Sequence, residues 1–304
     1  MKKMFFALFA VLAMVSCSNE EVIEVNREQI AFGEVFVDNA TRADYSTDKT
    51  VNAFKVYGTV SGTQIFNGAN VTRGSKANGE AWGCDGAAQY WLPNSTYNFA
   101  AIVDGIAATT DALPATIPFT VADGADNKDL LYATATVTTN ANATPSGVNG
   151  NGVVAFDFSH LLSKLQFNIV NETNQKYQVT SISVTDVAQD GIYNVGTGAW
   201  AQDGDATTTL TFGTATVAGG TLTPVPASEA RQLLPVAQTL NVTITYDVLD
   251  ASDNVVGSLE KEGTITQTFV KNTVYVVTAT LSGTAINFSF NTVNGWTTGS
   301  GLDI

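Results

Sequence analysis

Residues 153–170 (VVAFDFSHLLSKLQFNIV) restrict the fold of this chain more than any other segment. Phe156 and Phe158 alternate with small or polar residues before a short apolar turn. Leu165 and Phe167 continue the alternation after that turn. Apolar residues at every second position are typical of a strand that is buried on one face. The segment therefore predicts two strands that meet at a tight corner, and it assigns Phe158, Leu165 and Phe167 to one buried corner.

The sequence just upstream of this corner predicts a boundary between two domains. Residues 138–152 (TTNANATPSGVNGNG) are small, polar and glycine-rich, as in a linker or a long surface loop. A chain of 304 residues is also long enough for two domains that each bury a core. We therefore expect an N-terminal β-sandwich domain over residues 29–150 and a C-terminal one over residues 151–304.

The rest of the sequence favours sheets over helices. Charged residues make up 14% of the chain, below the roughly 25% that is typical of soluble domains. Short runs of period two, such as residues 97–103 and 240–248, alternate with turns rich in Gly, Asn and Asp, and helical periodicity is almost absent. This pattern predicts an all-β fold made of β-sandwiches.

The first residues indicate export. Two lysines precede an apolar run, residues 4–15, that is too short to span a bilayer and has the form of a signal peptide. The run ends in the sequence MVSC, which resembles the lipobox of bacterial lipoproteins. We expect a signal peptide over residues 1–16, a lipid such as palmitate on Cys17 and a polar tether over residues 17–28. An ordinary secretory signal is the alternative.

Composition argues against several functions. The formal net charge is −14 and no basic cluster is present, so we expect no nucleic acid among the partners. The single histidine, His160, is interpreted as a corner residue bonded to the backbone. No Cys/His or Ser/His/Asp arrangement stands out in the sequence, and there is no second histidine to choose from. We therefore predict that the chain is not an enzyme and needs no cofactor.

Two other features have structural interpretations. Asp123, Asp126 and Asp129 are spaced as calcium ligands could be, but no glutamate follows at the distance that a calcium loop needs. We interpret them as solvated turn acids and expect no metal site. If Cys17 carries lipid, Cys84 has no partner for an intrachain disulfide, and we interpret it as a small apolar filler.

Short motifs in a fixed order then suggest a family. They are residues 89–93 (QYWLP) before the strand 97–103, residues 129–133 (DLLYA), 156–160 (FDFSH), 162–165 (LSKL) and 234–235 (LP), and the ending 286–288 (INF) with Val293 and Trp296. In this order the motifs resemble the fimbrillin family, the lipoprotein precursors of type V pili. The resemblance covers nearly the whole chain. It implies two transthyretin-like β-sandwich domains, surface export and assembly by strand exchange.

The resemblance also implies a set of site residues. In the family, a protease cuts after an arginine beyond the first strand, and a strand of the next subunit, usually the C-terminal one, fills the groove that opens. Arg42 matches the processing site, although a solvated loop arginine is the alternative. The displaced strand would be residues 29–37, with Ile30, Phe32, Val35 and Phe36, and the donor strand would contain Ile286, Phe288 and Phe290.

The pattern of residues 29–37 adds one expectation of its own. Ile30, Phe32 and Phe36 alternate onto one face, while Ala31, Val35 and Val37 alternate onto the other. A strand that is apolar on both faces needs cover on both sides.

The function that the resemblance implies is a structural subunit of surface pili that supports adhesion. Its partners would be other pilus subunits, in a homo- or hetero-polymer, the outer membrane through the lipid, and host or bacterial surface ligands. It would be located in the fimbrium, at the outer membrane and cell surface. The alternative is a surface lipoprotein that binds glycans and never polymerises, with the tryptophans as stacking platforms for sugars: Trp82, Trp91, Trp200 and Trp296.

Overall fold

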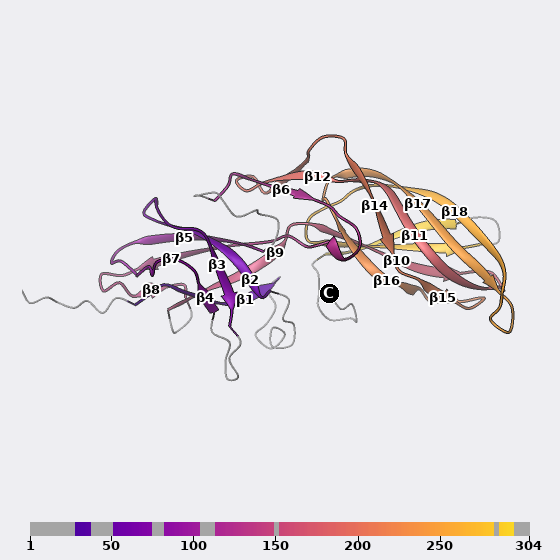
Figure 1. Cartoon of the computed structure of the whole chain (residues 1–304), viewed down its shortest axis with the longest axis horizontal. Coiled ribbons are helices and arrows are strands. Elements are labelled where there is room, and N and C mark those ends of the chain that lie inside the picture. Colours follow the sequence, from indigo (N-terminus) through magenta and orange to yellow (C-terminus); the bar gives the residue numbers. More distant parts are fainter. Residues whose placement is uncertain are drawn as a thin grey trace, which may run out of the picture.

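The computed structural model describes residues 28–37, 51–74, 82–103, 113–148, 152–282 and 286–294. Figure 1 shows an elongated molecule with strands gathered at its two ends. Among the described residues, the helical structure is one short 3-10 turn, η1 (Gly124–Asp126). The all-β prediction is confirmed. No helix in the described part has the length and apolar content needed to cross a membrane.

The first sheet occupies the left-hand end in Figure 1. Its order is β1 (Ala31–Val37), β9 (Val153–His160), β7 (Leu131–Thr139), β5 (Thr96–Val103), β2 (Ala53–Val60), β3 (Thr63–Arg73) and β4 (Trp82–Cys84), and β8 (Pro145–Ser146) pairs with β7. The end strands β1 and β4 lie in contact, so the sheet curls around its own core. That core is rich in aromatic rings from alternate strand positions, such as Phe54, Phe66, Phe99 and Phe156.

Two further sheets form the right-hand end (Figure 1). One has the order β16 (Val225–Leu233), β10 (Ser163–Asn171), β19 (Thr273–Leu281), β20 (Ile286–Asn294). The other has the order β14 (Thr207–Phe212), β11 (Lys176–Ala188), β17 (Ala237–Leu249), β18 (Val255–Thr268), and β15 (Ala215–Val217) pairs with β11. Both sheets contribute to a second core, in which Phe167 and Ile182 lie together with Val242 and Ile244.

Strands on each side of residue 150 in the sequence pair with strands on the other side. β9 follows that position in the sequence, yet it pairs with β1 and β7 in the first sheet. β6 (Thr116–Thr120) precedes it, yet it pairs with β12 (Asp190–Asn194), which also pairs with β13 (Ala199–Gln202). The expected domain boundary near residue 150 stays a prediction. Two segments of the chain connect the first sheet with the other strands across this position.

The apolar corner is one of these connections. β9 ends at His160 and β10 begins at Ser163, so only Leu161 and Leu162 separate them, and both are buried. The two strands belong to different sheets, which corrects the expectation of one shared corner core. Phe158 packs in the core of the first sheet, whereas Leu165 and Phe167 pack in the second core.

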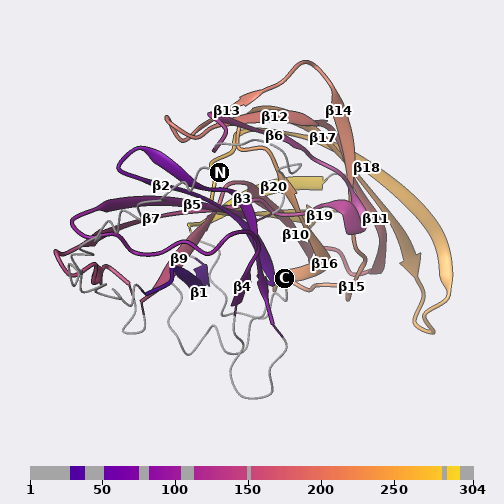
Figure 2. The same cartoon turned by 60° about the vertical axis from the view of Figure 1, so that its left-hand side comes forward.

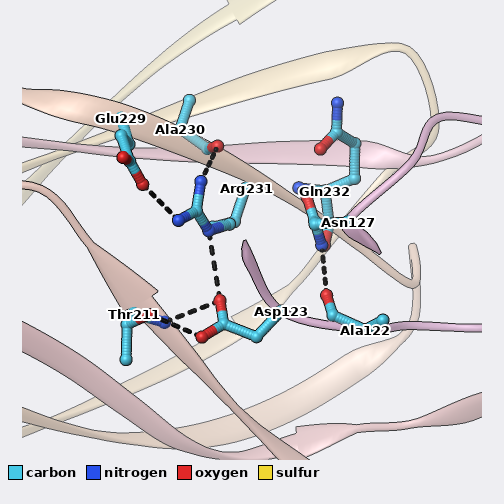
Figure 3. Close-up of polar contacts among 8 residues, drawn as sticks. All are labelled: Ala122, Asp123, Asn127, Thr211, Glu229, Ala230, Arg231 and Gln232. Atoms are coloured by element: carbon cyan, nitrogen blue, oxygen red, sulfur yellow. Dashed lines mark hydrogen bonds and ion pairs between the residues drawn. The ribbon is translucent and has the colours of Figure 1, made fainter. Parts of the chain in front are cut away.

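We call residues 113–130 the crossover segment, because they pass from the first sheet to the second group of strands. Figure 3 shows how polar side chains hold it there. The carboxylate of Asp123 accepts hydrogen bonds from the Thr211 amide (3.0 Å) and from Arg231 Nε (3.1 Å). The amide group of Asn127 donates to the carbonyl of Gln232 (3.0 Å) and accepts from its N–H (2.7 Å).

Two of the three acids, Asp123 and Asp129, are therefore not the solvated turn residues that the sequence suggested, whereas Asp126 is exposed in η1. Asp123 pairs with Arg231, and the carboxylate of Asp129 pairs with Nδ1 of the buried His160. The interpretation of His160 as a backbone-bonded residue missed this carboxylate partner, because Asp129 lies 31 positions away in the sequence. Within the described residues, no group of three or more His, Cys, Asp and Glu side chains could hold a metal ion.

The charge of Asp123 should stabilise the fold. Burial alone would raise its pKa, but hydrogen bonds from Thr211, Gly124 and Arg231 outweigh burial and hold the pKa below the ordinary value of 3.8. Asp123→Asn should lower the free energy of unfolding by about 1.5–3 kcal/mol at pH 7, as the loss of charge-assisted hydrogen bonds does. Because the pKa is lowered on folding, the difference should be full above pH 3.8 and shrink as pH falls through the folded-state value.

Urea unfolding of both proteins at pH 7 and at pH 3 tests this. Asp126→Asn is the matched control, because Asp126 is exposed in the same turn and its replacement removes the same charge. Equal effects of the two substitutions at pH 7 would contradict a special role for Asp123.

Candidate functional site

The strand β1 is the candidate site, and it lies at one end of the first sheet. It runs parallel to β9, from the pair Ala31 and Val153 to the pair Val37 and Phe158. On its other side, Ile30 N–H donates to the Gln89 carbonyl (2.8 Å) just before the strand begins. β1 therefore lies between β9 and the chain that follows β4.

Gly33 lets β1 come close to both neighbours. A Cβ at this position would lie 3.1 Å from Cγ1 of Val153 on β9 and 3.2 Å from Cδ1 of Trp82 on β4. These distances leave no room for a larger side chain unless a neighbour shifts. A strand without a side chain at this point fits the space between the two ends of the curled sheet.

A β-bulge decides which side chains of β1 are buried. The register shifts between Phe32 and Val35, so the extra residue brings Val35 into the same core as Ile30 and Phe32. The exposed fractions are 3% for Ile30, 4% for Phe32 and 0% for Val35, whereas Ala31 is exposed. The expected assignment of Val35 to a second covered face is wrong, because a shift of one residue moves later side chains to the other face. The side chain of Phe36 lies outside the described part.

Phe32 lies at the centre of the aromatic core. Its ring centroid is 5.1 Å from that of Phe66 on β3, 5.6 Å from Phe99 on β5 and 6.0 Å from Phe156 on β9. Such ring pairs contribute about 0.5–1.5 kcal/mol each beyond the burial of their area. β1 thus completes a core to which β2, β3, β5, β7 and β9 also contribute buried residues.

The predicted donor residues lie at the opposite end of the molecule. Ile286, Phe288 and Phe290 are in β20, the last described strand, which pairs antiparallel with β19 over nine positions. Phe288 is partly buried against the second core, at a place where a side chain on Gly263 of β18 would collide with its ring. The side chains of Ile286 and Phe290 lie outside the described part. Figure 2 shows β20 beside β19 and away from β1.

Two predicted site residues stay predictions. Cys17, the expected lipidation site, and Arg42, the expected processing site, both lie outside the described residues. β1 and Val51 flank the stretch that contains Arg42. The structure therefore places the residues of the expected displaced strand in β1 and those of the expected donor strand in β20. The two expected modification sites lie outside the described part.

Three of the four tryptophans named as possible sugar platforms lie in the described part, and each packs against other residues of the chain. Trp91 is fully buried, and its ring packs edge-on against Tyr97 at 4.7 Å. The indole N–H of Trp200 donates to the carbonyl of Leu161 (2.7 Å), and Trp82 packs against Phe54. Trp296 lies outside the described part.

Cys84 also differs from its interpretation as a core filler. It lies at an exposed position of β4. Partial covering of its thiol, together with the negative charge of Asp85, raises the pKa of Cys84 to about 11. The thiol stays protonated at neutral pH and is a poor nucleophile.

The fold and the site together define an all-β protein whose first and last described strands lie at the ends of sheets. The model of the fimbrillin-like family matches residues 41–296. The chain therefore belongs to the fimbrillin-like family, a structural family and not one of enzymes. Membership of a fimbrial family implies a place at the cell surface. No curated protein has a matching sequence.

Solved structures share the fold. A fimbrial protein from Bacteroides vulgatus matches with a TM-score of 0.64 and 18% identity, covering 88% of this chain and 99% of that one. A proposed cell-adhesion protein from Bacteroides uniformis matches with a TM-score of 0.58 and 19% identity, covering 88% and 98% of the two chains. At these identities the likeness concerns the fold alone.

The position of Phe32 gives a test of the site. Phe32→Ala should lower the free energy of unfolding by about 3–5 kcal/mol, because truncating a buried aromatic ring leaves a cavity. Denaturant unfolding measures the change. Leu222→Ala, at a side chain that is 68% exposed, is the control and should change stability by less than about 0.5 kcal/mol. Similar small losses in both variants would show that β1 does not complete the core.

Proposed function

We propose that the protein is a fimbrial subunit that is exported as a lipoprotein and assembles by strand exchange once β1 is removed. One observation supports this most: β1 is a terminal strand at the end of a sheet, yet it fills the centre of the core with Ile30, Phe32 and Val35. Such a strand can leave without breaking the pairing of other strands. Its departure would uncover Phe66, Phe99 and Phe156.

The free energy that holds β1 in the sheet explains why the proposal needs a cut in the chain. Three buried apolar side chains contribute about 1.5–3 kcal/mol each, and ladder hydrogen bonds add about 1 kcal/mol apiece. A strand from another subunit gains a similar amount but loses about 1–2 kcal/mol per ordered residue. It cannot displace a strand that is already held by its own chain. After cleavage at Arg42, the released strand would be diluted away and the groove would accept a new strand.

The donor in this proposal is β20 of the next subunit. It is also a strand at the end of a sheet, and leaving requires that it separate from β19 and from β18, where Phe288 lies against Gly263. Addition of a strand to an open sheet edge is an established mode of recognition. Because donor and groove lie on different parts of the subunit, the contact is head-to-tail and does not close, which produces a filament.

The cut itself can be tested with purified precursor and trypsin. Trypsin should cut first at Arg42, and the product should form ladders that resist mild detergent, because the open groove captures strands. Arg42→Ala should block both steps. Arg27→Ala is the matched control and should block neither, since Arg27 precedes the strand. A cut product that stays monomeric for days after losing β1 would contradict strand exchange.

The donor can be tested separately. A synthetic peptide of residues 286–304, added to cut subunits, should bind them and stop the ladders from growing. A peptide of the same composition in scrambled order is the control. Ladders that grow equally with both peptides would exclude β20 as the donor, without excluding polymerisation through another strand.

Lipidation is a further part of the proposal. Cys17→Ala should prevent attachment of the lipid, so the precursor should leave the membrane fraction and the detergent phase. Intact-mass measurement of both proteins gives the modification directly. Equal partition of the variant and the wild type into detergent would show that Cys17 is not the anchor.

A further inference from the structure

The outward face of the first sheet carries an open pocket of about 410 Å³. This volume falls within the range of about 300–1,000 Å³ that is typical of small-ligand sites. β2, β3, β5 and β7 form it, together with Leu113 at the start of the crossover segment. Among the described residues, none that lines it belongs to β1 or β20, although Phe99 also packs against Phe32 in the core. The pocket is therefore distinct from the candidate strand-exchange site.

Strand register brings the polar side chains of the pocket into one row. Thr59 on β2 lies opposite Gln64 on β3 and opposite Asn98 on β5, and Asn98 lies opposite Thr136 on β7. Neighbouring strands are about 4.8 Å apart. Four neutral side chains that can donate and accept hydrogen bonds thus lie at regular spacing across four strands.

A second row makes the hollow. Ala100 lies between Tyr57 on β2 and Thr134 on β7, and it is 5% exposed. Its small side chain leaves space between the larger neighbours. In the next row, Tyr132 on β7 lies opposite Ile102, so an aromatic ring borders the hollow from that side.

The two tyrosines are held by their surroundings. The Tyr57 hydroxyl lies near Gly68, where a Cβ would be 3.0 Å from it and where φ is +71°, so glycine is required at this point. The ring of Tyr132 is 6.3 Å from that of Tyr193 on β12. Burial, followed by the effect of Tyr193, raises the pKa of Tyr132, and the phenol stays neutral.

The lining excludes most ligand classes. No Asp, Glu, Lys or Arg among the described residues lines the pocket, so an ion would find no opposite charge. A purely apolar ligand would cover amide and hydroxyl groups without replacing their hydrogen bonds to water, which is unfavourable. A neutral molecule that carries many hydroxyl groups on an otherwise apolar ring matches both the polar row and the apolar surface of the pocket.

One contact prepares the pocket for such a ligand. The Thr136 hydroxyl donates to the amide oxygen of Asn98 (3.1 Å), so the amide nitrogen of Asn98 remains as a donor for a ligand oxygen. The aromatic rings and Ala100 offer apolar surface for the C–H groups of a sugar. We propose that this pocket binds a neutral carbohydrate of one or two sugar units. None of the three described tryptophans lines it.

The uncut precursor is the right material for the test, since its result then does not depend on polymerisation. Saturation-transfer difference NMR would be recorded with glucose, galactose, N-acetylglucosamine and lactose, and with N-acetylneuraminic acid as the charged comparison. We expect a signal from at least one neutral sugar and none from the acid. Asn98→Ala should weaken binding at least tenfold, because Asn98 is exposed and its loss removes a ligand contact without disturbing the core.

Two further variants sharpen the result. Asn70→Ala removes the same side chain from an exposed position of β3, in the same sheet but outside the pocket, and it should bind as the wild type does. Ala100→Leu should abolish binding by filling the hollow, and thermal unfolding checks that the variant is folded. Absence of signal from every neutral sugar would overturn the proposal. Equal binding by the Asn98→Ala and Asn70→Ala variants, or Asn98-dependent binding of the acid, would also overturn it.

Discussion

The structure depends on a two-residue turn that must bury its backbone while it joins two sheets. Leu161 and Leu162 are both buried, and a buried peptide group without a partner would cost several kcal/mol. The Leu161 N–H donates to the carbonyl of Leu130 (2.8 Å), and its carbonyl accepts from Trp200 (2.7 Å). The carbonyl of Leu162 accepts from the Asn272 N–H (2.9 Å). The corner can form only when the crossover segment, β13 and the start of β19 are all in place.

This corner also lies on the direct path between the two ends of the subunit. β1 pairs with β9, β9 continues through the corner into β10, and β10 runs parallel to β19, which pairs with β20. In the proposed filament, a pull on the donor strand would reach the groove of the same subunit along this path. The pair of the buried His160 and the half-buried Asp129 lies at the corner, and the crossover segment adds Asp123 and its bonds in parallel.

Sequence periodicity predicted the strands well but not their partners. Alternation located β9, β10 and the buried character of Ile30 and Phe32, because period two is a local property. The bulge that turns Val35 inward left no mark on the pattern of residues 29–37. The pairing of β6 with β12, and the bond of His160 to Asp129, depend on residues far apart in the chain. The polar residues of the proposed sugar pocket are each an ordinary Thr, Asn or Gln in the sequence, and only the register of four strands aligns them.

The two faces of the first sheet can therefore serve two purposes. On β5, Tyr97 and Phe99 point into the core that β1 completes, while Asn98 between them lies on the face of the pocket. A substitution at an outward position changes the ligand surface and leaves the aromatic groove intact, because successive side chains of a strand point to opposite faces. Subunits that share the proposed mechanism of assembly could in this way present different ligand surfaces. The constraint on the core is packing, whereas the constraint on the outward row is solubility and, in our proposal, the hydrogen bonds to the sugar.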